Sequence, residues 1–198
     1  MNIALRNIIK RATLATVALL LSFGIAGAQI DLRISKSKIK SSLKRLDQLE
    51  LLAAQLNTAS GSTQAAATPN TAQEATSAAA ASTQAAADQL CQIAKQCKEL
   101  SERNSHYINQ VNVLGTLQAS SEKVLQRTLL LTKLDSLSKE LASHKESISS
   151  IGSSIMSLGA SSKALKSIGA KILKIAEKEY LYQAMAVGNM ISALGAMK

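Results

Sequence analysis

The side chains that could do chemistry in this chain are few and lie far apart. The only histidines are His106 and His144, and the only cysteines are Cys91 and Cys97. Neither histidine stands at a metal-ligand spacing from a cysteine or a carboxylate. No glycine-rich phosphate loop and no nucleophile elbow occurs. The sequence therefore predicts no catalytic, metal-binding or cofactor-binding residue, no small-molecule substrate and no enzymatic activity.

The two cysteines are six positions apart. In an oxidising compartment a lone pair of cysteines usually forms one disulfide. Six positions of a continuous helix rise about 9 Å, whereas a disulfide needs its Cα atoms within about 7 Å. A bridge therefore requires a break in the helix between Cys91 and Cys97. We expect such a break with an intramolecular disulfide; another pairing and free thiols are the alternatives.

Residues 1–28 have the pattern of a secretory signal. Three basic residues and no acid precede an uncharged, mostly apolar run, which ends in the small residues Ala26-Gly27-Ala28. Small residues at these positions are what a signal peptidase requires. The sequence predicts cleavage before Gln29 and a periplasmic, cell-surface or secreted protein. The alternative, an N-terminal membrane anchor, needs roughly 20 apolar residues, and this run is shorter.

The composition predicts the fold class. The chain has no tryptophan, its only phenylalanine is Phe23 in the expected signal, and its only proline is Pro69. A core without large aromatic side chains must be aliphatic, as in helical bundles. Few breakers interrupt long helices, and glycine and proline are too sparse for the turns of a β-sandwich or barrel. We expect an all-α fold, an elongated helical bundle or antiparallel coiled-coil hairpin with a flexible low-complexity segment.

Two segments precede the expected bundle. Residues 29–57 predict an amphipathic cationic helix whose apolar residues recur at three- and four-residue steps. This is the pattern of a helix that packs on a bundle, and a cationic arm that touches a membrane is the alternative. Residues 58–87 are rich in Ala, Ser, Thr and Gln, which predicts a linker between separate parts. Its first part, to Asn70, is expected to be an exposed loop, and a capping box at Thr71–Glu74 predicts helix afterwards.

Residues 88–179 predict a helical bundle or coiled coil. Apolar residues recur in heptads from Leu130 to Ile175, which is typical of knobs-into-holes packing. Serine and glycine between 147 and 154 weaken the middle of this segment. A tight turn there would make two antiparallel helices, and one continuous helix is the alternative. His144 falls at a core position, which favours a hydrogen-bonded bundle histidine over a pH switch.

A cationic face follows in the last third of the chain. Residues 151–175 contain no acid and place four lysines opposite an apolar stripe: Lys163, Lys166, Lys171 and Lys174. In composition and periodicity this segment is similar to cationic membrane-active peptides of the bombinin kind. The resemblance implies contact with anionic lipid. A bundle helix with a solvated lysine face gives the same pattern and is the simpler interpretation.

The C-terminal residues 180–198 predict an apolar helix that is uncharged as far as Met197. Four small residues recur at four-residue steps: Ala184, Gly188, Ser192 and Ala196. Such a face lets two helix backbones approach closely. A buried bundle helix is the first expectation, and an oligomer contact or membrane insertion are the alternatives.

Charge and layout together suggest a class of function. Without the expected signal, 20 basic residues stand against 13 acids, a net charge of +7. Outside the cytoplasm such an excess favours anionic lipid or acidic protein over nucleic acid, although scattered charges are also typical of solvated helices. We expect an exported structural or interaction protein of the bacterial envelope, which binds itself or other envelope proteins through helix packing.

The layout resembles that of the minor pilus-tip proteins of type IV secretion systems, which are exported and rich in long helices. The resemblance implies a component of a secretion or conjugation apparatus. The alternative function is that of a membrane-active protein, which acts through its cationic and apolar helices.

Overall fold

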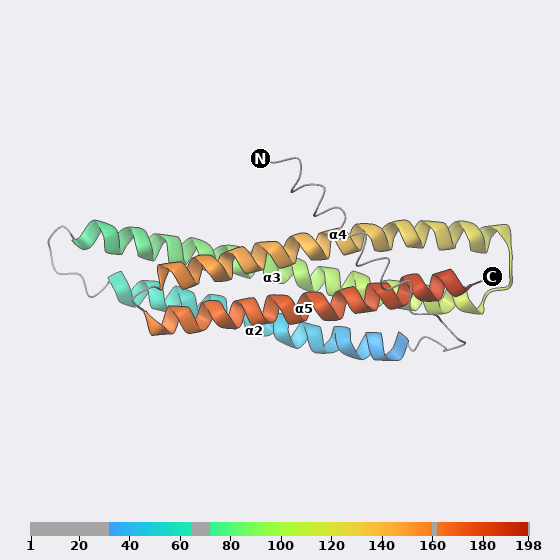
Figure 1. The fold of residues 1–198 in the computed structure, drawn as a ribbon, viewed down its shortest axis with the longest axis horizontal. Helices are drawn as coiled ribbons and strands as arrows, with labels where there is room; N and C mark the ends of the chain where they lie inside the picture. The colour runs from blue at the N-terminus through green and yellow to red at the C-terminus, as the bar shows by residue number, and fades with distance from the viewer. Residues whose placement is uncertain (1–31, 65–71, 160–161, 198) are drawn as a thin grey trace, which may run out of the picture.

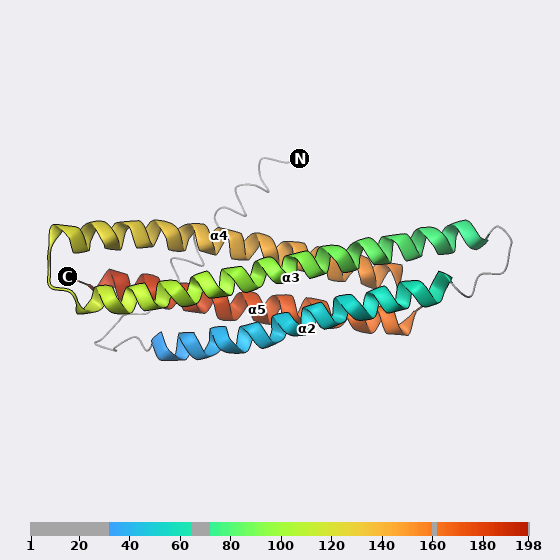
Figure 2. The same ribbon diagram turned by 180° about the vertical axis from the view of Figure 1, so that it is seen from behind.

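Four long helices form an elongated antiparallel bundle (Figures 1 and 2). The computed structural model describes residues 32–64, 72–159 and 162–197. The helices are α2 (Leu32–Gln64), α3 (Ala72–Thr116), α4 (Ser121–Leu158) and α5 (Lys163–Ala196). No strand occurs in these ranges. The predicted all-α bundle is therefore confirmed, while the predicted signal, residues 1–28, lies outside the described residues.

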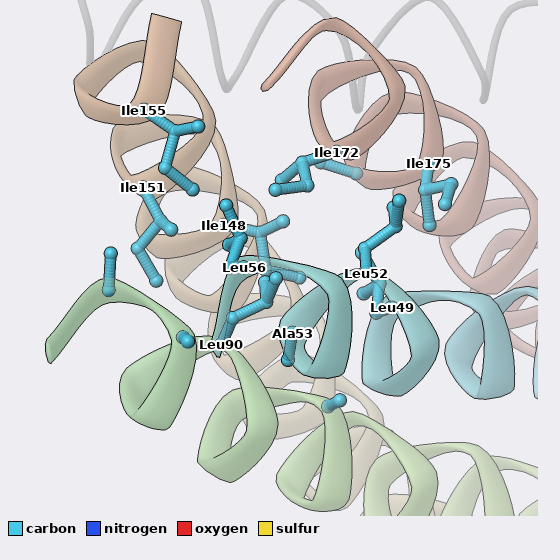
Figure 3. Close-up of a cluster of buried hydrophobic side chains, with 14 of the residues drawn as sticks. Leu49, Leu52, Ala53, Leu56, Leu90, Ile148, Ile151, Ile155, Ile172 and Ile175 are labelled. Carbon is cyan, nitrogen blue, oxygen red and sulfur yellow. The ribbon is translucent and has the colours of Figure 1, made fainter. Parts of the chain in front are cut away.

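The core is aliphatic along the whole length of the bundle. In one half, Leu49 and Leu56 of α2 and Leu90 of α3 pack against isoleucines of α4 and α5 (Figure 3). In the other half, Ile39 of α2 lies in a second cluster with Met190 of α5. Each such side chain contributes about 1.5–3 kcal/mol when it is buried. All four helices supply these residues, so the bundle has no separate N-terminal part.

The expected linker is mostly helix. Helix α2 continues to Gln64, seven residues into the segment where we expected an exposed loop. Helix α3 begins at Ala72, which agrees with the helix expected after the capping box, and residues 65–71 lie outside the described ranges. Leu52, Ala53 and Leu56, just before this segment, are buried against the bundle. Extending a helix that packing already stabilises costs less than starting one, so α2 continues into residues of weak helix propensity. Helix α2 is thus one of the four packed helices rather than a separate arm.

The heptad segment forms two helices, and the turn lies later than expected. Helix α4 runs through 147–154 and ends at Leu158, and Ser162 caps α5 by accepting a hydrogen bond from the Leu165 backbone N–H. Gly152 is buried at a close approach of α4 to α5: a Cβ added there would lie 3.0 Å from Leu173 Cγ. The glycine therefore serves helix contact, not a turn. Helix α5 also continues past residue 180, so 180–196 is its second half.

Candidate functional site

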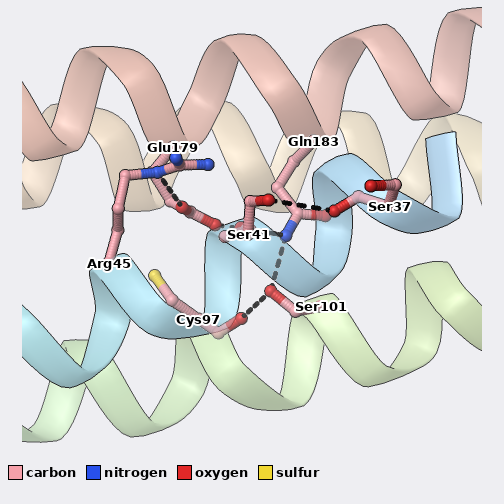
Figure 4. A network of polar contacts seen from close by, with 8 residues as sticks. Ser37, Ser41, Arg45, Cys97, Ser101, Glu179 and Gln183 are labelled. Carbon is pink, nitrogen blue, oxygen red and sulfur yellow. Dashed lines mark hydrogen bonds and ion pairs between the residues drawn. The ribbon is translucent and has the colours of Figure 1, made fainter. Parts of the chain in front are cut away.

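A buried polar cluster ties three helices together between the two halves of the apolar core (Figure 4). The Gln183 side chain of α5 is 1% exposed. Its Nε2 lies 2.7 Å from Ser42 Oγ of α2 and 2.5 Å from Ser101 Oγ of α3. Its Oε1 accepts a hydrogen bond of 2.6 Å from Asn104 Nδ2. These bonds satisfy polar groups that are costly to bury unpaired, and they fix how α2, α3 and α5 align.

Glu179 is the buried acid of this cluster. Its carboxylate lies 3.6 Å from Arg45 Nε and accepts a hydrogen bond from Gln183. The Arg45 guanidinium also lies 4.3 Å from the centroid of the Tyr182 ring. Burial raises the pKa of Glu179 above its ordinary value, and the contacts with Gln183 and Arg45 oppose that rise. These contacts join α2 to α5, which is a structural role for the acid.

The disulfide prediction is wrong. Helix α3 runs unbroken from Ala72 to Thr116, and both Cys91 and Cys97 are free thiols. No breaker separates them, and packing of Leu90 and Ala94, both fully buried, holds the helix straight. Burial, followed by the charge of Glu179, raises the pKa of the Cys97 thiol to about 12. Since the thiolate is the reactive form, Cys97 has the properties of a core residue.

The two histidines make local contacts. His144 is half-buried; its Nδ1 lies 2.7 Å from the Glu140 carbonyl oxygen and its Nε2 3.2 Å from Gln96 Oε1. This is the hydrogen-bonded bundle histidine that the sequence favours. His106 is exposed and contacts Gln110 on the same helix. Within the described ranges, no three His, Cys, Asp or Glu side chains are grouped so that they could hold a metal ion.

Formal charge is divided between two pairs of helices. By sequence, α2 and α5 together carry eleven basic and four acidic residues, whereas α3 and α4 carry eight of each. Helix α2 packs beside α5, and α3 packs beside α4. One side of the bundle is therefore strongly basic and the other is neutral. The excess of seven on the basic side equals the net charge expected for the mature chain.

Ion pairing accentuates this difference. Lys98 of α3 lies 2.8 Å from both Asp47 and Glu50, which are the two acids of α2. On the neutral side, Arg103 pairs with Glu140 across α3 and α4. The acids of α2 thus neutralise a lysine of α3 and leave the lysines of α2 without a carboxylate.

The predicted cationic face is exposed on the basic side. We define the basic face as the lysines on the exteriors of α2 and α5 for which no carboxylate of the described residues lies within ion-pair distance. Lys38 lies at the seam of the two helices, because its Nζ is 3.8 Å from Met185 Sδ and 5.9 Å from the centroid of the Tyr182 ring. The members are Lys36, Lys38, Lys40, Lys44, Lys163, Lys166, Lys171, Lys174 and Lys178.

The predicted small-residue face of the tail stays open. Ala184, Gly188 and Ser192 are half-buried and Ala196 is exposed. A Cβ added at Gly188 would meet nothing within 4 Å, so no side chain packs over this position. The neighbouring residues of α5 supply its core contacts, among them Val187, Met190 and Leu194. The bundle therefore buries one face of the tail, and an oligomer or membrane contact for the other stays a prediction.

Two surface features were missed by the sequence analysis. Five large apolar side chains are exposed around the turn from α3 to α4: Val113, Leu117, Val124, Leu125 and Leu129. A shallow groove of about 560 Å³ lies between α3 and α4, lined mainly by glutamines of α3 and serines of α4. The apolar residues Val124, Leu125 and Leu129 were visible in the sequence. Its exposure depends on how far the neighbouring helices extend, which no local pattern reports.

A comparison of the chain with protein-family models, curated proteins and solved structures finds no match. Within residues 32–64, 72–159 and 162–197, no helix is both long enough and apolar enough to cross a membrane.

Proposed function

We propose that this chain is an exported, non-enzymatic interaction protein of the bacterial envelope, and that it binds an acidic partner through the basic face. The division of charge is the observation that carries the proposal. The excess of seven positive charges along two neighbouring helices attracts anions over several ångströms. Their mutual repulsion disfavours the folded state, so a binding role is the simplest reason for gathering them on one side.

The interior supports a scaffold role. The buried titratable groups of the described residues, Glu179 and Cys97, contact Arg45, Gln183 and the core. With His144 they line a recess of only about 10 Å³, which leaves no room for a substrate. The groove between α3 and α4 is open, and its only ionisable lining residue is Glu146. General acid–base or nucleophilic chemistry requires a positioned acid, base or nucleophile beside a space that holds a substrate. Neither the groove nor the surroundings of Glu179 and Cys97 combine the two.

The pilus-tip layout suggests a finer version of the proposal, in which the protein is assembled into a secretion or conjugation apparatus. The open small-residue face of α5, from Ala184 to Ala196, would then contact other subunits. The competing function is a membrane-active protein whose tail inserts. Insertion would first have to expose apolar side chains of α5 that the bundle buries, such as Val187, Met190 and Leu194.

Cosedimentation with a washed bacterial envelope fraction tests the proposal. The mature protein, residues 29–198, should pellet with the envelope at low salt and be released at high salt, since salt screens exposed charges. A variant with Lys166, Lys171 and Lys174 changed to Glu should lose most of this binding. A matched variant of the neutral side, with Lys95, Lys133 and Lys139 changed to Glu, has the same net charge and should keep it. Equal loss in the two variants, or no pelleting of the natural protein, would refute the proposal.

A further inference from the structure

The exposed surface of α5 carries three lysines followed by two apolar side chains along one line. Lys171, Lys174, Lys178, Leu181 and Met185 follow one another at three- and four-residue steps and are all exposed. Residues at these steps lie on one face of a helix. Leu181 is 52% exposed and Met185 is 40% exposed. Charged and apolar groups thus share one outward surface, so an anionic membrane that attracts the lysines also meets Leu181 and Met185.

The shape of this surface suits a plane. The 34 residues of α5 extend for about 50 Å, and α2 lies antiparallel beside α5 (Figure 1). Lys44 and Leu51 of α2 are exposed, and Leu51 is 62% exposed. The charges are therefore spread over a long, two-helix side of the rod instead of being gathered at one point.

The choice of side chain favours a diffuse anionic surface over a shaped acidic pocket. Every member of the basic face is a lysine. Arg45, on the same side, is turned to Glu179 and Tyr182. Arginine recognises a particular carboxylate or phosphate with a rigid, bidentate fork, whereas lysine is a hydrated point charge on a flexible stem. Among the described side chains of α2 and α5 no arginine is exposed. The lysines of the basic face therefore fit many mobile headgroups better than one fixed acidic group.

We propose that the basic face docks the intact bundle, lying flat, on an anionic phospholipid bilayer. This inference rests on the proposed function and names the partner of the same face. The lysines contact the headgroups, and Leu51, Leu181 and Met185 enter the interface only shallowly. The buried apolar residues of α5, such as Ile172 and Met190, stay in the core, so binding is peripheral.

Sedimentation with lipid vesicles tests the inference. The mature protein should pellet with vesicles of phosphatidylcholine mixed with phosphatidylglycerol, and it should stay in solution with phosphatidylcholine alone. Each lysine near an anionic surface strengthens partitioning about fivefold, so replacing Lys166, Lys171 and Lys174 by Gln should weaken it about a hundredfold. The matched change of Lys95, Lys133 and Lys139 to Gln should weaken it less than fivefold. Circular dichroism of each variant controls for folding.

The outcomes separate this inference from the proposed function. One outcome is that the protein fails to bind vesicles and still binds the envelope fraction. If protease treatment of the envelope then abolishes that binding, the partner is a protein and the lipid inference is overturned. Equal weakening by the two triple variants would overturn the assignment to the basic face. Leakage of vesicle contents, or binding that survives high salt and alkaline washing, would overturn the peripheral mode. Salt-reversible binding without leakage supports the inference.

Discussion

Two glycines of α5 offer a matched test of the packing. At Gly169 an added Cβ would lie 2.5 Å from Met156 Cγ and 2.7 Å from the Gly152 carbonyl oxygen of α4. At Gly188 the same atom would meet nothing within 4 Å. Both glycines lie inside one helix, so alanine brings the same gain in helix propensity, about 1 kcal/mol. Only the first position has a cost in packing.

The expected effects on unfolding free energy have opposite signs. Gly188→Ala should stabilise the bundle by about 0.5–1 kcal/mol, because nothing opposes the propensity gain. Gly169→Ala must push α4 and α5 apart against a backbone oxygen, and overpacking of this kind costs about 1–3 kcal/mol. Because one clash is with a backbone oxygen, the cost lies in the upper part of this range, at about 2–3 kcal/mol. Subtracting the propensity gain of about 1 kcal/mol leaves a net loss of about 1–2 kcal/mol.

Thermal and urea unfolding, followed by circular dichroism, measure both effects. For a chain of this size about 1 kcal/mol shifts Tm by about 2–4 °C, so Tm should rise for Gly188→Ala and fall for Gly169→Ala. Gly152→Ala provides a second close-contact variant, since its Cβ would lie 3.2 Å from the Gly169 carbonyl oxygen. A Gly169→Ala protein as stable as the natural one would contradict the close approach of α4 and α5. A destabilised Gly188→Ala protein would show that something packs on the small-residue face.

Three further predictions concern the interior. Without reductant, denatured protein should react with two equivalents of a thiol reagent, because both cysteines are free. In the folded protein Cys97 should react much more slowly than Cys91, because burial raises the pKa of its thiol to about 12. A single disulfide-bonded species would contradict this prediction. The raised pKa of Glu179 means that its stabilising effect is complete below the unfolded pKa and is lost as pH rises through the folded pKa. In urea unfolding, the unfolding free energy of the natural protein minus that of the Glu179→Gln variant should therefore fall from pH 4 to pH 7. A value that stays constant or rises over this range would refute the prediction. Gln183→Leu should cost about 1–3 kcal/mol, because it removes the shorter of the two acceptors of the buried Asn104 amide and leaves only the Gln183 carbonyl oxygen at 3.3 Å. An unchanged urea midpoint would show that water replaces the lost bond.

Predictions from the spacing of neighbouring residues were wrong where a local turn or disulfide pattern lies inside a helix that continues. Gly152 and its serine neighbours are typical of a turn, yet α4 continues through them because the glycine lets α5 approach. Cys91 and Cys97 suggested a disulfide, yet burial of Leu90, Ala94 and Leu100 against the bundle keeps α3 continuous. In both cases a tertiary contact outweighed a preference of neighbouring residues.

The sequence predicted only part of the basic face. Lys163, Lys166, Lys171 and Lys174 were recognisable from their position opposite an apolar stripe, and they are exposed as that pattern predicts. Lys38 of α2 joined them only when α2 was placed beside α5. Lys178 follows on the same helix, because α5 continues past residue 175. The buried cluster around Gln183 carries no sequence signal, because glutamine, serine and asparagine are equally common on exposed helix surfaces.

The sequence by itself determined that this protein is helical and that its core is aliphatic, since periodicity and the lack of breakers act within each helix. Only the tertiary structure decided which helices are neighbours. That pairing brings Lys98 to the two acids of α2, and it leaves the lysines of α2 and α5 without a carboxylate partner among the described residues. The physical reason is the distance along the chain over which each effect acts. Helix propensity and amphipathicity act over a few residues. Charge compensation depends on side chains that are about 50 residues apart in the chain and meet only in the packed bundle.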